Sequence, residues 1–210
     1  MLDREDVVRR LERLNEQIYA ELGVSDALPE IVLVGGSALL LKDCTRIPRP
    51  TSDIDALMVD KRIVHLLAEW DINDDANTFL FRFPMGWENR KEALKLDLDC
   101  LRVYVPSNED LFIAKAIAGR ENDMQDIASM LGKDSVNLKT VEAILQDPGE
   151  VFLNVEDEVW EKLQINLEKV IEKGTIDATP RFQQMDEEIH PGARRAGEVQ
   201  SKRGHGTRPR

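Results

Sequence analysis

The sequence has few cysteines: only Cys44 and Cys100 occur in 210 residues. Neither belongs to a CxxC motif or a Cys/His cluster, which argues against a structural zinc site. Both are expected to be free thiols, as is usual in a reducing compartment. No apolar run approaches the roughly 20 residues that a membrane-spanning helix needs, and the charged N-terminus lacks the features of a signal peptide. We therefore expect a cytoplasmic protein that does not enter a membrane.

Positive charge is scarce relative to negative charge. The formal net charge is −12, and the acidic excess lies within residues 1–180, because residues 181–210 carry seven Lys or Arg and four Asp or Glu. General electrostatic attraction to nucleic acid requires clustered Lys and Arg. If the protein acts on a polyanion, local basic residues and metal ions must therefore offset the charge of the acidic body.

Several common catalytic and nucleotide-binding motifs are also missing. Neither GxGxxG nor GxxxxGK[ST] occurs, which excludes a Rossmann dinucleotide site and a P-loop. The three histidines do not support a Ser-His-Asp or Cys-His mechanism, and no HExxH points to zinc hydrolysis.

The hydrophobic pattern predicts an α/β core followed by a helical C-terminal part. A helix is expected over residues 4–22 and would end at Gly23. Strands are expected at 30–34, 54–59 and 94–105, with a further possible strand at 79–83. Helices are expected at 37–42, 61–70, 108–118, 121–132, 137–146 and 155–173. These elements suggest a core at 1–106, a helical region at 107–174 and a disordered basic tail at 175–210.

The first motif, Gly35-Gly36-Ser37, follows a short apolar strand and precedes a helix. A glycine pair lets the backbone turn tightly and approach a ligand closely. The free N–H groups at the start of the next helix face an anion, and the Ser37 hydroxyl adds a donor. The motif suits a phosphate group, although such turns are also common without a ligand.

The second motif is Asp53-Ile54-Asp55, which heads another apolar run. Residues i and i+2 of a strand point to the same side, so both carboxylates would face together while Ile54 faces the core. Two adjacent carboxylates repel each other unless a cation lies between them. Mg²⁺ commonly binds one or two carboxylates together with substrate phosphates and water.

Taken together, residues 32–59 (VLVGGSALLLKDCTRIPRPTSDIDALMV) resemble the DNA polymerase β-like nucleotidyltransferase superfamily. The phrase R-x-T/S-x-DID, with Arg49 and Thr51, is similar to the minimal, AbiEii-like toxin branch and its DUF6036-like nucleotidyltransferases. A second block, residues 103–131, carries the recurring elements of that branch: an EDL at 109–111, Lys115, Arg120, and an acidic pair formed by Asp123 and Asp126. The resemblance implies a small mixed-sheet core.

The resemblance also implies roles for individual residues in a two-metal phosphoryl transfer. Asp53 and Asp55 would bind Mg²⁺ or Mn²⁺, and Lys115 would point at the triphosphate. A third carboxylate from a neighbouring strand is expected, either Asp97 or Asp99, with Asp99 preferred. The nucleotide-binding set would be Gly35, Gly36, Ser37, Arg49, Lys115 and Asp126, with Asp126 orienting Lys115 or Arg120.

The implied activity is transfer of an NMP from a nucleoside triphosphate, such as ATP or GTP, to an unknown acceptor. RNA (including tRNA), a protein or a small molecule would each fit, and the chain could be the toxin that an antitoxin protein inhibits. The alternative is a catalytically degenerate module of the same fold that binds a nucleotide or a partner. Other loop residues, including Arg46, Trp87 and Arg90, could reach the ligand or serve only in packing.

Overall fold

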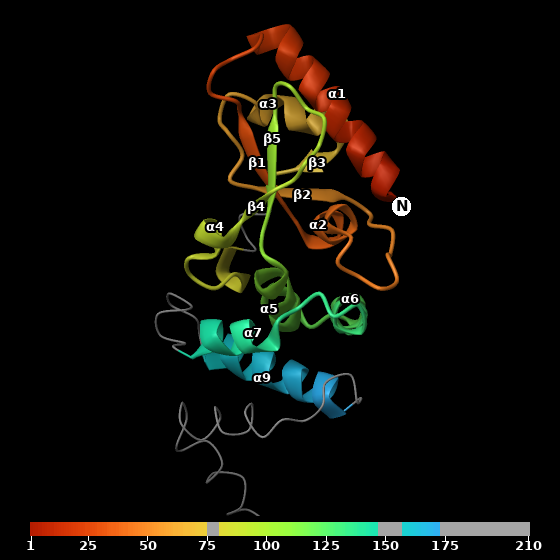
Figure 1. Cartoon of the computed structure of the whole chain (residues 1–210), viewed down its shortest axis with the longest axis vertical. Coiled ribbons are helices and arrows are strands. Elements are labelled where there is room, and N and C mark those ends of the chain that lie inside the picture. The colour runs from red at the N-terminus through yellow and green to blue at the C-terminus, as the bar shows by residue number, and fades with distance from the viewer. Residues whose placement is uncertain (75–79, 147–156, 173–210) are drawn as a thin grey trace, which may run out of the picture. The chain divides into compact units, whose positions relative to one another are not determined.

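The structure of the chain is a computed structural model that describes residues 1–74, 80–146 and 157–172 (Figure 1). All of these residues belong to one compact unit. The expected tail at 175–210 lies outside the described residues, and the expected boundary near residue 106 stays a prediction. Within the described ranges, no helix is both long enough and apolar enough to cross a membrane.

A five-stranded mixed sheet forms the core of the described chain. Its spatial order is β3-β2-β1-β5-β4. The strands are β1 (Glu30–Val34), β2 (Ile54–Leu57), β3 (Ile72–Asn73), β4 (Glu92–Ala93) and β5 (Arg102–Val105). The central strand β1 is antiparallel to β2 and parallel to β5. Its last four residues are buried, as expected for a strand that is covered on both faces.

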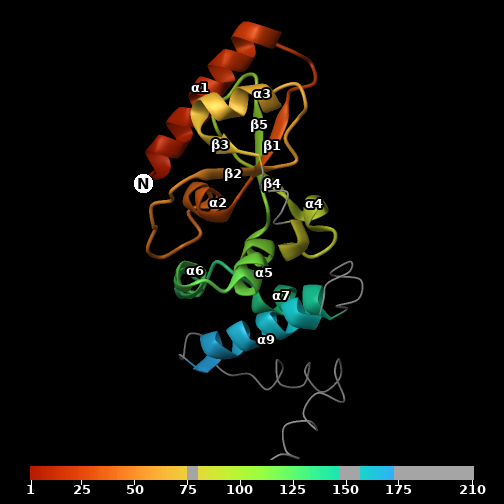
Figure 2. The same cartoon turned by 180° about the vertical axis from the view of Figure 1, so that it is seen from behind.

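The N-terminal helix α1 (Arg4–Leu22) buries one apolar stripe, formed by Val7, Leu11, Leu14 and Ile18. A capping box between Asp3 and Asp6 starts the helix, and Gly23, with a φ of 66°, ends it. Helix α1 packs against α2 (Gly35–Lys42), α3 (Val64–Leu67) and the 3₁₀ helix η1 (Ala68–Trp70). Figures 1 and 2 show these helices beside the sheet.

The helical C-terminal part consists of α5 (Asn108–Ala118), α6 (Glu121–Gly132), α7 (Leu138–Leu145) and α9 (Asp157–Glu172). Helix α5 is the centre of this part, because it contacts the other three helices. In both views the four helices lie together beyond the end of the sheet that carries α2 (Figures 1 and 2). The fold class predicted from the sequence is therefore confirmed.

Two strand predictions were wrong. Residues 80–82 form a 3₁₀ turn, and residue 79 lies outside the described chain. Residues 94–101 contain no strand, so β5 begins only at Arg102. Leu94 N–H donates to the Val103 carbonyl, but Leu96 N–H and Leu98 N–H then donate to carbonyls only two residues back. These tight local turns replace the strand hydrogen bonds that the alternation of Leu with Lys and Asp at 94–99 suggested.

Other elements differ from their expected ranges in smaller ways. The helix expected at 61–70 is divided into α3 and η1, and a short helix α4 (Trp87–Arg90) precedes β4. Cys44 and Cys100 are free, as predicted, and both are buried. Burial raises the pKa of the Cys44 thiol to about 11, so this cysteine is a poor nucleophile at neutral pH.

Candidate active site

A pocket of about 480 Å³ opens where the end of β1 meets the start of β2. One wall consists of the β1–α2 turn, the loop before β2 and Asn73 of β3. The opposite wall consists of α5, the α5–α6 turn and the start of α6. Met1 and residues 82 and 83 complete the lining. The pocket therefore brings the two sequence motifs together with the second block of the resemblance.

The strand register places the aspartates beside the glycine turn. In the antiparallel pairing of β1 with β2, Asp55 lies opposite Val34, the residue before Gly35. Asp53 and Asp55 both line the pocket, whereas Ile54 is fully buried in the core. Burial, and then the negative charge of Asp53, raise the pKa of the Asp55 carboxyl above its usual value. The site thus disfavours two unneutralised carboxylates.

The donor set at this position fits a divalent cation. Neither Asp53 nor Asp55 forms an ion pair with any described residue, and Asn73 donates from Nδ2 to Asp55 Oδ1 over 3.1 Å. The described residues contain no group of three or more His, Cys, Asp or Glu that could hold a metal ion. Mg²⁺ commonly binds one or two protein carboxylates and takes its remaining ligands from substrate phosphates and water.

Glycine is favoured at both positions of the turn, by the backbone conformation at Gly35 and by a close approach at Gly36. Gly35 has a φ of 65°, and a Cβ added there would lie 3.3 Å from Asp55 Oδ2. A Cβ on Gly36 would lie 2.6 Å from Thr51 Oγ1. Thr51 is buried and pairs with Leu2 through two backbone hydrogen bonds. The turn, Thr51 and Asp55 are consequently packed as one unit.

Ser37 does not point into the pocket, which differs from its expected role as a phosphate donor. Its hydroxyl is buried and donates to the Val34 carbonyl over 2.9 Å. This bond supports the first turn of α2 from inside. The sequence could not distinguish this inward bond from a bond to a ligand, because serine favours both at the start of a helix.

The opposite wall carries a buried network of charged groups centred on Lys115. The Lys115 Nζ lies 3.0 Å from Asp123 Oδ1 and 2.7 Å from Asp126 Oδ2, and all three side chains are at most 8% exposed. Arg49 adds a bond from Nη2 to Asp126 Oδ2 over 3.0 Å. Asp126 therefore contacts both Lys115 and Arg49, and it reaches the pocket only through them.

Asp123 also binds Arg120, which together with Gly119 links α5 to α6. The Arg120 Nε donates to Asp123 Oδ2 over 2.7 Å, and Nη2 donates to Oδ1 over 3.3 Å. Burial alone would raise the pKa of Asp123, but hydrogen bonds from Arg120 and the charge of Lys115 outweigh it, so this pKa is lowered. Asp123 is ionised at neutral pH and fixes both cations.

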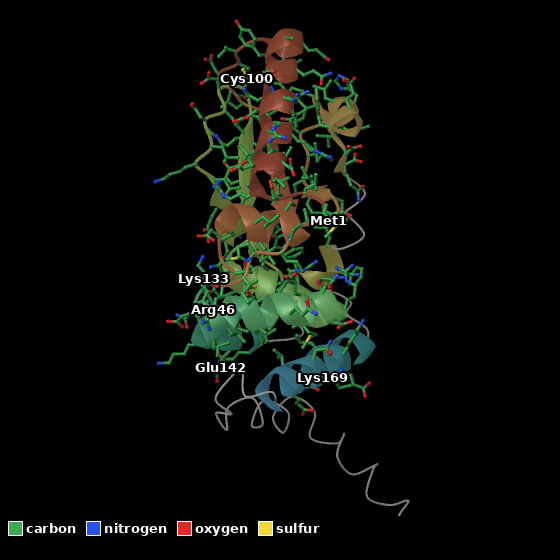
Figure 3. All side chains as sticks on the ribbon, turned by 90° about the vertical axis from the view of Figure 1, so that its right-hand side faces the viewer. Met1, Arg46, Cys100, Lys133, Glu142 and Lys169 are labelled. Carbon is green, nitrogen blue, oxygen red and sulfur yellow. The ribbon has the colours of Figure 1, made fainter. Side chains whose placement is uncertain are left out.

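Asp97 and Asp99 do not join this site. Arg102, just after them, pairs with Glu30 at the start of β1, whereas the pocket lies at the end of that strand. Their neighbour Cys100 lies far from Met1, which lines the pocket (Figure 3). Both aspartates are exposed, and their loop is bound to α1 by a hydrogen bond from Cys100 N–H to Asn15. The long strand on which their expected placement rested does not form.

The structure adds residues that the motifs did not indicate, among them Asn73 and Arg82. Asn73 pairs with Asp55 across the parallel strands β2 and β3, a contact that local sequence spacing does not encode. The other candidates lie outside the pocket lining: Arg46 does not line it, Trp87 is buried against Phe83, and Arg90 binds the buried Asp110.

Comparison with known proteins supports a family assignment. Residues 9–174 match the model of a protein family described as "Nucleotidyltransferase of unknown function (DUF6036)". No curated protein and no solved structure matches the chain. The match covers most of the chain and includes both motifs and every residue of the charged network around Lys115. The chain therefore belongs to the DUF6036 family of nucleotidyltransferases of unknown function.

Proposed function

We propose that this protein transfers an NMP from a nucleoside triphosphate to an acceptor, with Mg²⁺ or Mn²⁺ as the cofactor. The observation that carries the proposal is the apposition of two carboxylates, Asp53 and Asp55, with the glycine turn and the cationic side chains Lys115 and Arg120 in one pocket. The carboxylates suit a metal ion, and the turn and the cationic side chains suit a triphosphate. Membership of the family supports the same class of reaction.

In the proposed reaction, an acceptor oxygen forms a bond to the α-phosphorus of the triphosphate. The bond from that phosphorus to the oxygen that bridges to the β-phosphate breaks, its electrons leave with pyrophosphate, and the acceptor proton is released to water. A bound divalent metal would orient the phosphates and neutralise the charge that develops on the leaving group. Asp53 and Asp55 would hold that ion. Gly35 and Gly36 would allow close approach of the phosphates, and Lys115 and Arg120 would attract them.

The direct test offers the purified chain each α-labelled nucleoside triphosphate with Mg²⁺, and cellular RNA or protein as acceptor. The test variant is the pair Asp53→Asn and Asp55→Asn. The control is the pair Asp97→Asn and Asp99→Asn, which removes two carboxylates at the same spacing from an exposed loop remote from the pocket. We expect the wild type and the control to transfer label, and the test variant to be inactive. Equal transfer by all three proteins would refute the assignment of Asp53 and Asp55.

The second candidate function is nucleotide binding without turnover. It is favoured by the absence, among the described residues, of a third acidic side chain grouped with Asp53 and Asp55. Stabilisation of the wild type by a nucleoside triphosphate and Mg²⁺, with no pyrophosphate released in the presence of any acceptor, would support this candidate.

We further propose that this protein is the toxin of a toxin–antitoxin pair and that tRNA or another RNA is its acceptor. The support for this role is the resemblance of the Arg49-x-Thr51-x-Asp53-Ile54-Asp55 phrase to the AbiEii-like branch. The test is induced expression in a bacterial host. Growth arrest by the wild type, and normal growth with the Asp53→Asn/Asp55→Asn variant, is the expected result. Normal growth with both proteins, at equal amounts of protein, would contradict the toxin role.

A further inference from the structure

Arg120 is an exposed side chain whose ion-pair partner is buried. It follows Gly119, which ends α5 in the left-handed conformation with a φ of 61°, and it precedes the first turn of α6. Its partner Asp123 is only 2% exposed, whereas the Arg120 side chain is 70% exposed. One edge of the guanidinium is therefore fixed by a buried carboxylate while the rest faces the pocket that contains Asp53 and Asp55.

The bonds to Asp123 leave some N–H donors of the Arg120 guanidinium available for a ligand. A guanidinium has five N–H donors in a rigid fork. Asp123 accepts one from Nε and one from Nη2, which leaves three. No other hydrogen bond joins the Arg120 side chain to a described residue. A preoriented fork with remaining donors is the arrangement with which arginine recognises phosphate oxygens.

A second arginine lines the same pocket. Arg82 is partly buried, and its pKa is lowered first by that burial and then by the positive charge of Arg120. The two guanidinium groups are thus close enough to repel each other. The charge of Arg120 also acts on Asp55 and Asp53 across the pocket. A ligand that fits here must present negative charge to the arginines and accept a cation at the aspartates. Both properties belong to a metal-bound polyphosphate.

We propose that Arg120 and Arg82 form a subsite for the terminal phosphates of the nucleoside triphosphate, the part that leaves as pyrophosphate. This inference rests on the proposed function and deepens it. Asp123 is the positioning residue, because its carboxylate fixes the Arg120 fork. The subsite favours a triphosphate over a monophosphate, since a monophosphate lacks the groups that the arginines bind.

The test is a set of binding measurements by calorimetry on the full chain with Mg²⁺. The probes are inorganic tripolyphosphate, ATP and AMP, and the variants are Arg120→Gln and Arg82→Gln. The control is Arg102→Gln, an exposed arginine of β5 that pairs with the far end of β1. We expect each test variant to raise the Kd of tripolyphosphate and ATP about tenfold or more, which is the effect of losing a hydrogen bond to a charged group. The Kd of AMP and the behaviour of the control should be unchanged.

The outcomes separate the subsite from the catalytic proposal. Unchanged tripolyphosphate affinity in both test variants would overturn the subsite. A higher KM for the acceptor with an unchanged Kd for ATP would also overturn it, because the arginines would then bind an acceptor phosphate. Tripolyphosphate binding that depends on Arg120, in a wild type that transfers no NMP, would retain the subsite and reject catalysis. If Arg120→Gln unfolds, Arg82→Gln still decides, because it leaves the bonds of Asp123 to Lys115 and Arg120 intact.

Discussion

Replacing Gly36 with alanine should show that the glycine turn and the aspartate loop are one packed unit. The added Cβ would lie 2.6 Å from Thr51 Oγ1 and 3.0 Å from Thr51 Cβ, against 3.4–4 Å for an ordinary contact. Thr51 cannot retreat easily, because its backbone N–H and carbonyl are both bonded to Leu2. Overpacking of this kind costs about 1 to 3 kcal/mol. The higher helix propensity of alanine offsets at most about 1 kcal/mol of that. We expect a net loss of about 1 to 2 kcal/mol in the free energy of unfolding.

The assay is urea denaturation of a double-mutant cycle that combines Gly36→Ala with Thr51→Ala. Removing the Thr51 hydroxyl removes the shorter clash, so the alanine at position 36 should cost less in that background, by at least about 0.5 kcal/mol. Gly23→Ala is the control, since a Cβ at Gly23 meets nothing within 4 Å and adds only the strain of its φ of 66°. Equal costs of Gly36→Ala with threonine or alanine at position 51 would refute the packing argument.

Two further predictions concern the charged walls of the pocket. Asp55→Asn should leave the metal-free protein at least as stable as the wild type at neutral pH, because burial and Asp53 disfavour the Asp55 charge, and it should abolish thermal stabilisation by Mg²⁺ with ATP. An undiminished Mg²⁺ effect in a melting assay would contradict this. Asp123→Asn should cost about 2 kcal/mol in urea unfolding at pH 7, since it weakens the charged hydrogen bonds to Arg120 and Lys115, while Lys115 keeps its pair with Asp126. Because the pKa of Asp123 is lowered in the folded state, its contribution is complete above about pH 4 and is lost as the pH falls further, so the gap between variant and wild type should narrow in acid. A gap independent of pH would show that the loss arises from packing.

Much of the fold was predictable because its signals are local. The amphipathic stripe of α1 and the buried run of β1 each lie within one element, and each predicted an element that the structure contains. The strand expected at 94–105 is absent over residues 94–101, because a local pattern can fit more than one structure. Along residues 94–99, Leu alternates with Lys or Asp, which places apolar side chains on one side of the chain and charged side chains on the other. Successive tight turns produce this arrangement as well as a strand does.

The candidate site was predictable where its residues lie close in sequence. The glycine turn and the Asp53-x-Asp55 pair could be identified because a strand fixes the direction of residues two apart. Asn73 and Arg82 could not be found in this way, because they reach the pocket through strand pairing and chain packing. The remote position of Asp99 has the same origin, since the parallel register of β5 with β1 determines at which end of the sheet it lies.

The buried acids Asp123 and Asp126 hold Lys115 and Arg120 on the helical wall of the pocket, and Asp126 also pairs with Arg49 from the loop before β2. Lys115 is bonded to both acids, so its charge is engaged on its own wall and does not form an ion pair with Asp55. Arg120 is anchored in the same way at one edge of its fork. An ion pair between one of these cations and Asp53 or Asp55 would occupy a proposed metal ligand and a proposed phosphate donor at once. Desolvating two buried carboxylates is costly, but their bonds to Lys115 and Arg120 leave Asp53 and Asp55 without an ion pair among the described residues, and so accessible to a metal-bound ligand.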